Sequence, residues 1–402
     1  MPTTSTAATV VLKSRRALPF FAQHPWVFAG AVQKTSGTIE PGAEVAVVTD
    51  KDEFIAWGLY NPQSNIQIRL YSWDPDVRLD EDFWRARLEA AVGLRRDVLG
   101  LVKPESACRL VYSEADGISG LVADRYGDWL LLQFTSLALG MRRELLSRLL
   151  QEIMQPRGIW LRTEKGMRAA EGLDVADGLV SGEAPPRPMF IKEHGLRYEM
   201  DVVEGQKTGF FVDQRDNRLA AANYADGKRV LDVCCYTGGF SLNVLQHGGA
   251  ISVRGIDQSE AALQLARNNA ELNGLGSRAQ FEKQDAFQAL EQARDAGEKY
   301  GMIILDPPKM ARQGKAVEGA LRGYHMLNRM AIECLEPGGI LVTCSCSGHV
   351  SREMFEDMLA EAALSADRRL QILESRGAAA DHPTLVSCME TNYLKCCICR
   401  VA

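Results

Sequence analysis

Two cysteines near the end of an apolar run are spaced for covalent chemistry. Cys344 and Cys346 lie in the segment TCSCSG at 343–348, directly after the apolar residues 340–342. If this run is a buried strand, alternation places both thiols on one face, at or just past its carboxyl end. Open α/β sheets bind their ligands at that edge. At least one thiol could therefore be a nucleophile or a ligand, unless both only pack there.

Three aspartates also follow runs that have the pattern of buried strands. Asp257 ends the run ISVRGID, Asp285 follows AQFEKQ, and Asp306 precedes two prolines in LDPPKM. Asp257 would suit acceptance of ribose hydroxyls, and Asp285 could meet an adenine amino group. The prolines fix φ and remove two donors, which would hold Asp306 rigidly against a planar substrate. Each acid alone could equally be a helix cap or a surface charge, whereas three at successive strand ends favour a ligand site.

The segment VLDVCCYTGGF, residues 230–240, has the form of a strand that ends in a glycine turn before a helix. Such a turn brings backbone N–H groups close to a bound ligand. The dinucleotide fingerprint G-x-G-x-x-G is absent, because Cys234 and Tyr236 stand where glycines are expected and only Gly238 and Gly239 remain. Alone, the segment fits a cofactor cradle and an ordinary strand–helix turn equally well.

These residues need a scaffold that brings strand ends together, and the second half of the chain has the pattern for one. We expect strands at 229–236, 251–257, 279–284, 302–308, 340–344 and 392–402, and helices at 259–275 and 321–339. Ser259 is suited to cap the first of these helices and Gly274 to end it. Strands that alternate with helices predict an α/β fold with a parallel, doubly wound sheet, which we assign to residues 190–402.

The first half of the chain has a different rhythm. Residues 9–75 alternate as short strands punctuated by Gly and Pro, which predicts a small β domain. Residues 76–184 form a predicted α+β middle domain. Its expected parts are a helix at 81–99, strands within 108–139, a helix at 141–154 and a strand at 158–163. The three prolines of SGEAPPRP at 181–188 block regular structure and indicate a linker.

Composition limits the class of protein. A chain of 402 residues with 46% hydrophobic and 24% charged residues is globular and long enough for two or three domains. No apolar stretch approaches twenty residues, and the amino terminus lacks the order of a secretory signal, so we expect no membrane partner and a cytoplasmic location. Ten cysteines are too sparse for a disulfide scaffold. The net charge of −6 argues mildly against nucleic acid, but it says little about a local basic patch.

The thiols at 396–399 raise the question of a metal site. Zinc sites combine C-x₂-C with a second pair elsewhere, whereas the run CCIC lies in the expected terminal strand, where small thiols pack well. Cys234, Cys235 and Cys388 are interpreted in the same way, and we predict no metal site. His382 could line a base pocket or hold a loop.

Several of these segments resemble a known family. LDVCCYTGGF, the strand-end Asp257, DAF at 285–287 and LDPPK are similar to motifs of class I S-adenosylmethionine-dependent methyltransferases. VVEGQKTGFFVDQRDNR (202–218), CYTGGF, ILDPPK, RGYHMLN and TCSCSG together resemble bacterial large-subunit (23S) ribosomal RNA cytosine-5 methyltransferases with an amino-terminal PUA domain. The resemblance covers nearly the whole chain and is strongest over 195–350. It implies a PUA-like β-barrel, a middle domain and a Rossmann-like methyltransferase domain.

The resemblance also implies the cofactor, S-adenosylmethionine, and the residues that hold it. One group would close over its methionine end, a second would form its cradle, and acids would bind the ribose and adenine. These residues are Lys207, Thr208, Phe211, Asp213 and Gln214 for the first group, Cys235, Tyr236, Thr237, Gly238 and Gly239 for the second, and Asp257 on the ribose and Asp285 near the adenine; Asp306 is also counted with the cofactor site.

Cytosine-5 methylation would explain a thiol at this place. Carbon 5 is a poor nucleophile, and addition of a thiolate to carbon 6 makes it enamine-like. The family motif places the nucleophile at the cysteine between two serines, here Cys346, with Cys344 as a packing neighbour. Asp306 would hold the base. Many relatives have a second cysteine after the motif prolines, whereas this chain has Lys309, which could help product release.

Basic residues near these features suggest where RNA would bind. Lys13, Arg15 and Arg16 open the small β domain, and Arg312 and Lys315 follow the proline turn. Either run alone is more often a solvated face, but beside a cofactor site phosphate contact is favoured. The partner implied is ribosomal RNA, and a homodimer stays open.

Two other functions remain as alternatives. Guanine N7 methylation uses the same DPP turn but needs no thiol at position 346. A non-catalytic RNA-binding assembly protein would keep only a vestigial cofactor site.

Overall fold

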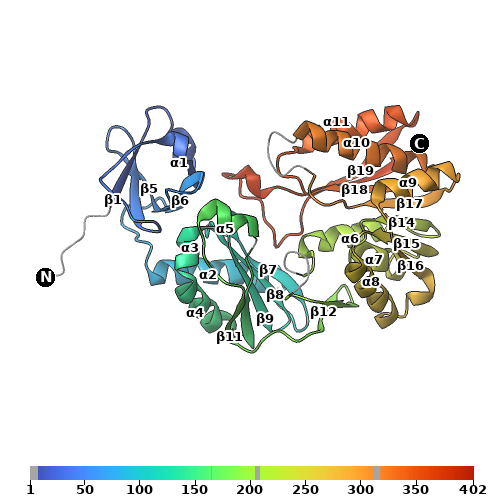
Figure 1. Ribbon diagram of the computed structural model, residues 1–402, viewed down its shortest axis with the longest axis horizontal. Helices are drawn as coiled ribbons and strands as arrows, with labels where there is room; N and C mark the ends of the chain where they lie inside the picture. The colour runs from blue at the N-terminus through green and yellow to red at the C-terminus, as the bar shows by residue number, and fades with distance from the viewer. Residues whose placement is uncertain (1–7, 164, 204–208, 311–316) are drawn as a thin grey trace. The chain divides into compact units, whose positions relative to one another are not determined.

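The computed structural model of the protein describes residues 8–163, 165–203, 209–310 and 317–402 (Figure 1). The chain forms two compact units. The first consists of Met1–Met189, Asp201–Phe210 and Ala380–Thr391, and the second of Phe190–Met200, Phe211–Ala379 and Asn392–Ala402. Among the described residues, no helix has both the length and the apolar character needed to cross a bilayer.

The first unit opens with a six-stranded sheet. Its strands are β1 (Ala8–Leu12), β2 (Trp26–Phe28), β3 (Val32–Thr35), β4 (Glu44–Val48), β5 (Phe54–Tyr60) and β6 (Ile66–Ser72), in the order β2-β6-β5-β4-β1-β3. A short helix, α1 (Leu18–Phe21), follows β1. Alternating apolar residues such as Val10, Leu12 and Val45 fill the core. The small β domain expected from the sequence is therefore confirmed.

A five-stranded sheet with helices completes the first unit. Its strands are β7 (Ala107–Tyr112), β8 (Leu121–Tyr126), β9 (Trp129–Phe134), β10 (Gly158–Leu161) and β11 (Gly178–Gly182), with helices α2 (Glu81–Gly93), α3 (Leu137–Met141), α4 (Arg143–Met154) and α5 (Lys165–Glu171). The helix expected at 81–99 is α-helical only to Gly93 and continues as a π-helical turn, Leu94–Val98. The buried Arg95 of that turn donates to Asp116 at 2.6 Å and to the Asp381 carbonyl at 2.7 Å. The bond to Asp381 ties the returning segment 380–391 to the unit.

The second unit is built on a seven-stranded sheet. Its strands are β14 (Arg229–Val233), β15 (Ser252–Asp257), β16 (Ala279–Lys283), β17 (Tyr300–Leu305), β18 (Leu335–Ser345), β19 (Leu370–Arg376) and β20 (Lys395–Val401), in the order β16-β15-β14-β17-β18-β20-β19. Its helices are α6 (Arg215–Ala222), α7 (Gly239–Gln246), α8 (Glu260–Leu272), α9 (Ala286–Asp295), α10 (Val317–Glu333) and α11 (Arg352–Ser365). A hairpin of β12 (Met189–Glu193) and β13 (Leu196–Met200) precedes them.

Helices cover both faces of this sheet. Leu231 and Val233 of β14 belong to a core that α9, α10 and α11 share, so these helices lie on one face. Asp232 alternates with those two residues and bonds Ser241 of α7 at 2.6 Å, so α7 lies on the other face. Ser259 caps α8 by accepting from Ala262 N, and Gly274 follows its end with φ of 68°. The doubly wound architecture and both helix-end assignments are confirmed.

Two expectations for this sheet need correction. Strands β14 to β18 are parallel, but β20 runs antiparallel between β18 and β19, so the sheet is mixed. Antiparallel neighbours need no crossover helix, so β20 can lie between β18 and β19 without a crossover helix that leads into it. The helix expected at 321–339 ends at Glu333, and residues from Leu335 already belong to β18. Pro337 and Gly338, with φ of 77°, cannot continue a helix.

Candidate active site

The carboxyl ends of the parallel strands meet at one edge of the sheet, and the candidate acids gather there. Four aspartates act on the thiol of Cys234, which follows β14. Burial first, and then these four carboxylates, raise the pKa of that thiol far above its usual range. The four are Asp232, Asp257, Asp285 and Asp306. The three strand-end acids named from the sequence therefore all lie near enough to this thiol to act on its ionisation.

The loop after β14 has an unusual backbone. Cys234, Tyr236 and Gly238 all have left-handed φ, at 64°, 50° and 84°. A left-handed residue other than glycine costs about 1–2 kcal/mol, so this loop holds strain at two positions. Alternating left-handed residues turn successive N–H groups toward one side, as in anion-binding nests. The sequence lacks the expected glycines at 234 and 236, but the backbone adopts the conformation that glycines would allow.

Asp257 and Asp285 organise the turns around this loop. Asp257 accepts from Tyr236 N at 3.0 Å and from Ser259 N at 2.8 Å. Asp285 caps α9 by accepting from Phe287 N at 2.9 Å, and its other oxygen accepts from the Gln258 side chain. Asp285 is therefore a helix cap, which was one of the two interpretations of this residue. Both carboxyls remain partly exposed, so neither cap prevents a ligand contact.

Asp306 follows β17 and is half-buried. Burial raises its pKa to about 7, and the neighbouring charge of Asp213 adds to the rise. Arg218 and a hydrogen bond from Gln214 oppose it. Near neutral pH a large share of this carboxyl is therefore protonated and able to donate a hydrogen bond.

The segment before α6 supplies the next group. A 3₁₀ turn, Val212–Gln214, places Asp213 and Gln214 in the interior. The Phe211 ring packs edge-to-face on Tyr236, with ring centroids 5.0 Å apart. Asp213 accepts from the Tyr393 hydroxyl. Lys207 and Thr208, named with this group from the sequence, lie outside the described residues.

The remaining cradle residues are tightly placed. Thr237 is buried, and its carbonyl accepts from Asn269 at 3.1 Å. A side chain at Gly239 would meet the Arg218 guanidinium at 2.6 Å. Cys235 is buried, and burial raises the pKa of its thiol well above the usual value. The cradle therefore has little room for larger side chains.

The two thiols of TCSCSG have different surroundings. Cys344 is completely buried and lies opposite Cys396 in the neighbouring strand. A hydrogen bond with Cys396 and burial raise the pKa of Cys344 well above the usual value. Cys346 lies just beyond the end of β18 and is partly exposed. Of the pair, only Cys346 has a thiol that a substrate can reach.

Two residues near Cys346 were not identified from the sequence. Lys395, at the start of β20, is 3% exposed and donates to the carbonyls of Ser347 at 2.7 Å and Tyr393 at 2.8 Å. The buried Tyr324 hydroxyl lies 3.1 Å from Ser347 Oγ. A lysine that opens an otherwise apolar strand was the one available signal. Tyr324 sits in RGYHMLN without any distinguishing spacing.

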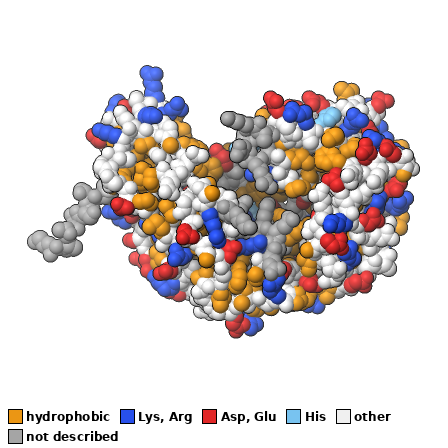
Figure 2. Space-filling model, in the orientation of Figure 1, with side chains coloured by type: hydrophobic (Ala, Val, Ile, Leu, Met, Phe, Trp, Pro, Cys, Tyr) orange, Lys and Arg blue, Asp and Glu red, His pale blue; other side chains and the backbone are white. Residues whose placement is uncertain are grey.

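The basic residues named as RNA contacts fall into two groups. Lys13, Arg15 and Arg16 are exposed, as is Lys309 after the proline turn. Arg312 and Lys315 lie outside the described residues. Figure 2 shows Lys and Arg side chains interspersed with Asp and Glu on the visible face. A local cluster, rather than the overall charge, would therefore have to attract RNA.

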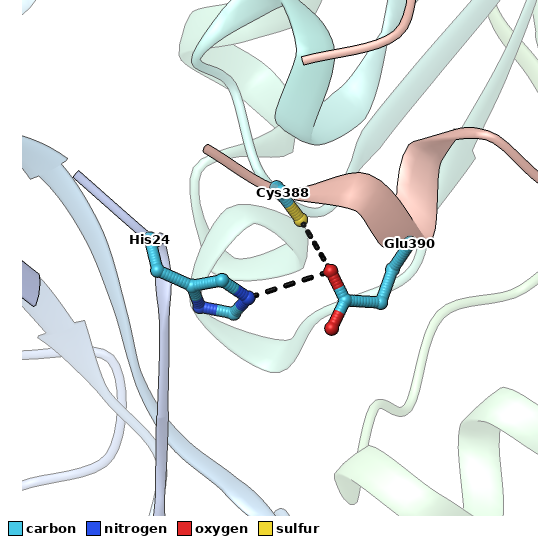
Figure 3. A group of neighbouring side chains, drawn as sticks. All are labelled: His24, Cys388 and Glu390. Carbon is cyan, nitrogen blue, oxygen red and sulfur yellow. Dashed lines mark hydrogen bonds and ion pairs between the residues drawn. The ribbon is translucent and has the colours of Figure 1, made fainter. Parts of the chain in front are cut away.

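One group in the first unit has side chains of the kind that bind metals. His24, Cys388 and Glu390 place their ligand atoms within 4.8 Å of one another (Figure 3). However, His24 Nδ1 accepts from Trp26 N at 3.2 Å, so the proton of the neutral ring is on Nε2, 3.4 Å from Glu390. The Cys388 thiol donates to the same carboxylate at 3.4 Å. This pattern is a hydrogen-bonded cluster in which Nε2 has no lone pair to offer.

His382, the other histidine considered from the sequence, has a structural environment. It is buried, and its Nδ1 lies 3.1 Å from Asp381. Asp381 also accepts from the backbone of Arg109 at 2.9 Å. The loop interpretation of His382 therefore accounts for its position.

Comparison with known proteins points to the same family of methyltransferases that the sequence motifs resemble. Residues 167–386 match the profile of S-adenosylmethionine-dependent methyltransferases, and residues 10–73 match that of PUA-like domains. The Ribosomal RNA large subunit methyltransferase I of Erwinia tasmaniensis is 41% identical over 393 residues, which cover 98% of this chain and 99% of that protein. The Escherichia coli protein of the same name is 39% identical with the same coverage.

Solved structures share the fold. A methyltransferase from Streptococcus mutans has a TM-score of 0.84 at 21% identity, covering 98% of this chain and 99% of that one. SMU.776, a methyltransferase complexed with S-adenosylhomocysteine, has a TM-score of 0.85 at the same identity and coverage. The matches over nearly the whole chain, together with the site at the sheet edge, show that this protein belongs to the ribosomal RNA large subunit methyltransferase I family of S-adenosylmethionine-dependent methyltransferases.

Proposed function

We propose that this enzyme methylates carbon 5 of a cytosine in large-subunit (23S) ribosomal RNA through a covalent adduct with Cys346. The observation that carries the proposal is the position of a partly exposed thiol just past β18, beside β17, the strand that Asp306 follows. Strands β17 and β18 are hydrogen-bonded neighbours, with Leu305 opposite Thr343. Cys346 and Asp306 therefore follow neighbouring strands at the same edge of the sheet, which supports the roles proposed for them.

The residues at the edge fit the cofactor. Tyr236, Asp257 and Asp285 are each partly exposed, while their chain neighbours Cys235 and Ile256 are buried. We assign the N–H groups of the left-handed loop to the methionine end and the two acids to the ribose and adenine. Phe211, Asp213 and Gln214, with Lys207 and Thr208, complete this assignment. S-adenosylmethionine supplies the methyl group as an electrophile.

The protein's side chains would prepare the base for that transfer. The Cys346 thiolate adds to carbon 6, and the electron pair of the 5,6 double bond moves into the ring. Protonated Asp306 donates to ring nitrogen 3, where negative charge gathers, and so stabilises the adduct. After carbon 5 has taken the methyl group, a base removes its proton, and the thiolate leaves carbon 6. Each bond that Cys346 forms is broken again, so the thiol is regenerated.

Lys309 is assigned to product release. It is exposed beside the proline turn, and its charge reaches the buried Lys395 next to the thiol turn. A cation at this place would stabilise the thiolate of Cys346 and so favour its release from carbon 6 over the covalent adduct.

RNA binding is assigned to the small β domain and to the segment after the proline turn. Lys13, Arg15 and Arg16 would contact phosphates, and Phe21 and Phe28, which are 51% and 48% exposed, would stack on bases. Arg312 and Lys315 would add phosphate contacts. We retain the three-domain division at 9–75, 76–184 and 190–402, and a cytoplasmic location, as part of this proposal.

Nucleoside mass spectrometry tests the proposal directly. Ribosomal RNA from cells that lack the enzyme is incubated with the protein and methyl-labelled S-adenosylmethionine. Labelled 5-methylcytidine that disappears with Cys346→Ala and persists with Cys344→Ala is the expected result. Labelled 7-methylguanosine would favour the guanine alternative, and an absence of labelled nucleoside with normal cofactor binding would favour the assembly protein.

A further inference from the structure

Lys395 occupies an unusual place for a lysine. It lies opposite Ser345 in the antiparallel pair of β18 and β20, and it is almost completely buried. Among the described residues, its Nζ donates to the carbonyl oxygens of Ser347 and Tyr393. A buried ammonium is costly unless it is hydrogen-bonded and faces an opposite charge. Two neutral carbonyls meet the first condition but not the second.

The charged and titratable groups that face Lys395 come from three elements. Cys346 follows β18, Lys309 follows β17, and Arg352 begins α11. The pKa of Lys395 is lowered to about 8, chiefly by burial; a charge on Cys346 raises this pKa, and the charges of Arg352 and Lys309 lower it. Of these three groups, Cys346 is the one that becomes an anion. Because such coupling is reciprocal, an ammonium that a thiolate stabilises must stabilise that thiolate equally.

We propose that the Lys395 ammonium stabilises the Cys346 thiolate and fixes, through its bond to the Ser347 carbonyl, the turn that carries the thiol. This inference rests on the proposed role of Cys346 as nucleophile. Lys395 is a positioning residue, because its Nζ is held by backbone carbonyls and acts on the substrate only through the thiol.

The proton balance of this arrangement is simple. The Cys346 thiol releases its proton to solvent, and Lys395 keeps its own, so the resting pair is thiolate and ammonium. When the thiolate adds to carbon 6, its charge moves into the base, and the ammonium is left beside a neutral thioether. That loss of attraction favours the return of the sulfur as thiolate at the end of the reaction.

Alkylation of Cys346 tests the coupling. Iodoacetamide rates at this residue are followed by peptide mass spectrometry over a range of pH in the full-length protein, with Lys395→Met and Lys395→Arg as variants. Met keeps the length of the side chain and removes its charge, whereas Arg keeps the charge. Lys395→Met should move the midpoint of the rate profile up by about one pH unit and slow alkylation about tenfold near neutral pH. Lys395→Arg should restore the profile toward that of the unchanged protein.

Superimposable profiles for Lys395→Met and the unchanged protein would overturn the proposal. Calorimetric binding of S-adenosylmethionine checks that each variant is folded. If the Lys395 variants do not fold, the thiolate absorbance of the unchanged protein, minus that of Cys346→Ser, gives the midpoint without them. A midpoint below the ordinary thiol value of about 8.5 supports the proposal, and one at or above it contradicts it.

The two proposals fail in distinguishable ways. Persistent 5-methylcytidine with Cys346→Ala would remove the nucleophile role while the alkylation profiles still report the Lys395 coupling. If the alkylation profile of Lys395→Met is unchanged and the Cys346→Ala variant is inactive, only the proposed coupling of Lys395 to Cys346 is contradicted.

Discussion

Two loops at the same edge of the sheet each carry a partly exposed cysteine, and their surroundings are opposite. Cys234, after β14, is surrounded by four carboxylates that oppose its ionisation. Cys346, after β18, lies near the buried Lys395, whose charge favours an anion. The first loop is shaped by left-handed backbone, and the second is held by side chains from β20 and α10. A cysteine at a sheet edge is therefore not a nucleophile by position alone, since the neighbouring charges decide.

The largest expected difference between the loops is in methyl transfer. Cys346→Ala should lower the rate by at least about 10³-fold, because the rest of the site cannot replace a covalent nucleophile. Cys234→Ala should stay within a few-fold of the unchanged enzyme. Single-turnover assays with saturating cofactor would measure the methyl-transfer rates of both variants. Equal losses of rate would show that the two cysteines do not differ in catalytic role.

Thiol reactivity should differ next most strongly. We expect iodoacetamide to modify Cys346 about a hundredfold faster than Cys234 near pH 7, because burial and the four carboxylates keep the Cys234 thiol protonated and each unit of pKa changes the thiolate fraction about tenfold. Quantitative mass spectrometry of the two peptides in one sample provides an internal control. Faster modification of Cys234 would reverse our electrostatic assignment.

The acids between the loops lead to a prediction about stability. The folded-state pKa of Asp306 is raised to about 7, so the free energy of unfolding falls as pH rises from about 4, where the carboxyl of the unfolded chain ionises, to about 7, above which the loss is complete. Asp306→Asn cannot ionise and should be more stable than the unchanged protein by about 1–2 kcal/mol near pH 8, after allowance for partial exposure. Near pH 4 the two should unfold alike.

Chemical denaturation at both pH values measures this difference. Activity should be lost in Asp306→Asn at every pH. The charge on the base changes when the adduct forms and breaks, and a carboxyl can share or take back its proton as this happens, whereas an amide does not titrate. A variant that is less stable near pH 8 would show that the carboxylate is paired rather than strained.

The smallest effects concern the backbone of the first loop. Gly238→Ala should cost about 1–2 kcal/mol of unfolding free energy, because alanine disfavours a φ of 84°. Cys234→Gly relieves the same strain at its own position and should change stability by less than about 1 kcal/mol, with a gain expected. A large loss with Cys234→Gly would show that packing of the thiol, rather than backbone conformation, fixes the loop.

Much of this fold could be predicted from local pattern. The strand–helix alternation, the Ser259 cap and the small β domain depend on periodicity and turn residues that lie close together in the chain. The strand-end acids could be predicted to lie near one another, because the carboxyl ends of parallel strands lie at the same edge of a sheet. The end of α10 was placed wrongly, since the apolar periodicity continued past Glu333 although Pro337 stops the helix.

The sequence by itself determined the class of fold and the short list of chemical groups, because motifs such as LDPPK and TCSCSG are contiguous. Only the tertiary structure decided which thiol is accessible and what charge faces it. Lys395 lies 48 residues after Ser347 and reaches it only because β20 inserts antiparallel beside β18. That pairing is a long-range burial event, and its consequences for the pKa of a thiol and a lysine cannot be seen in any local stretch of the chain.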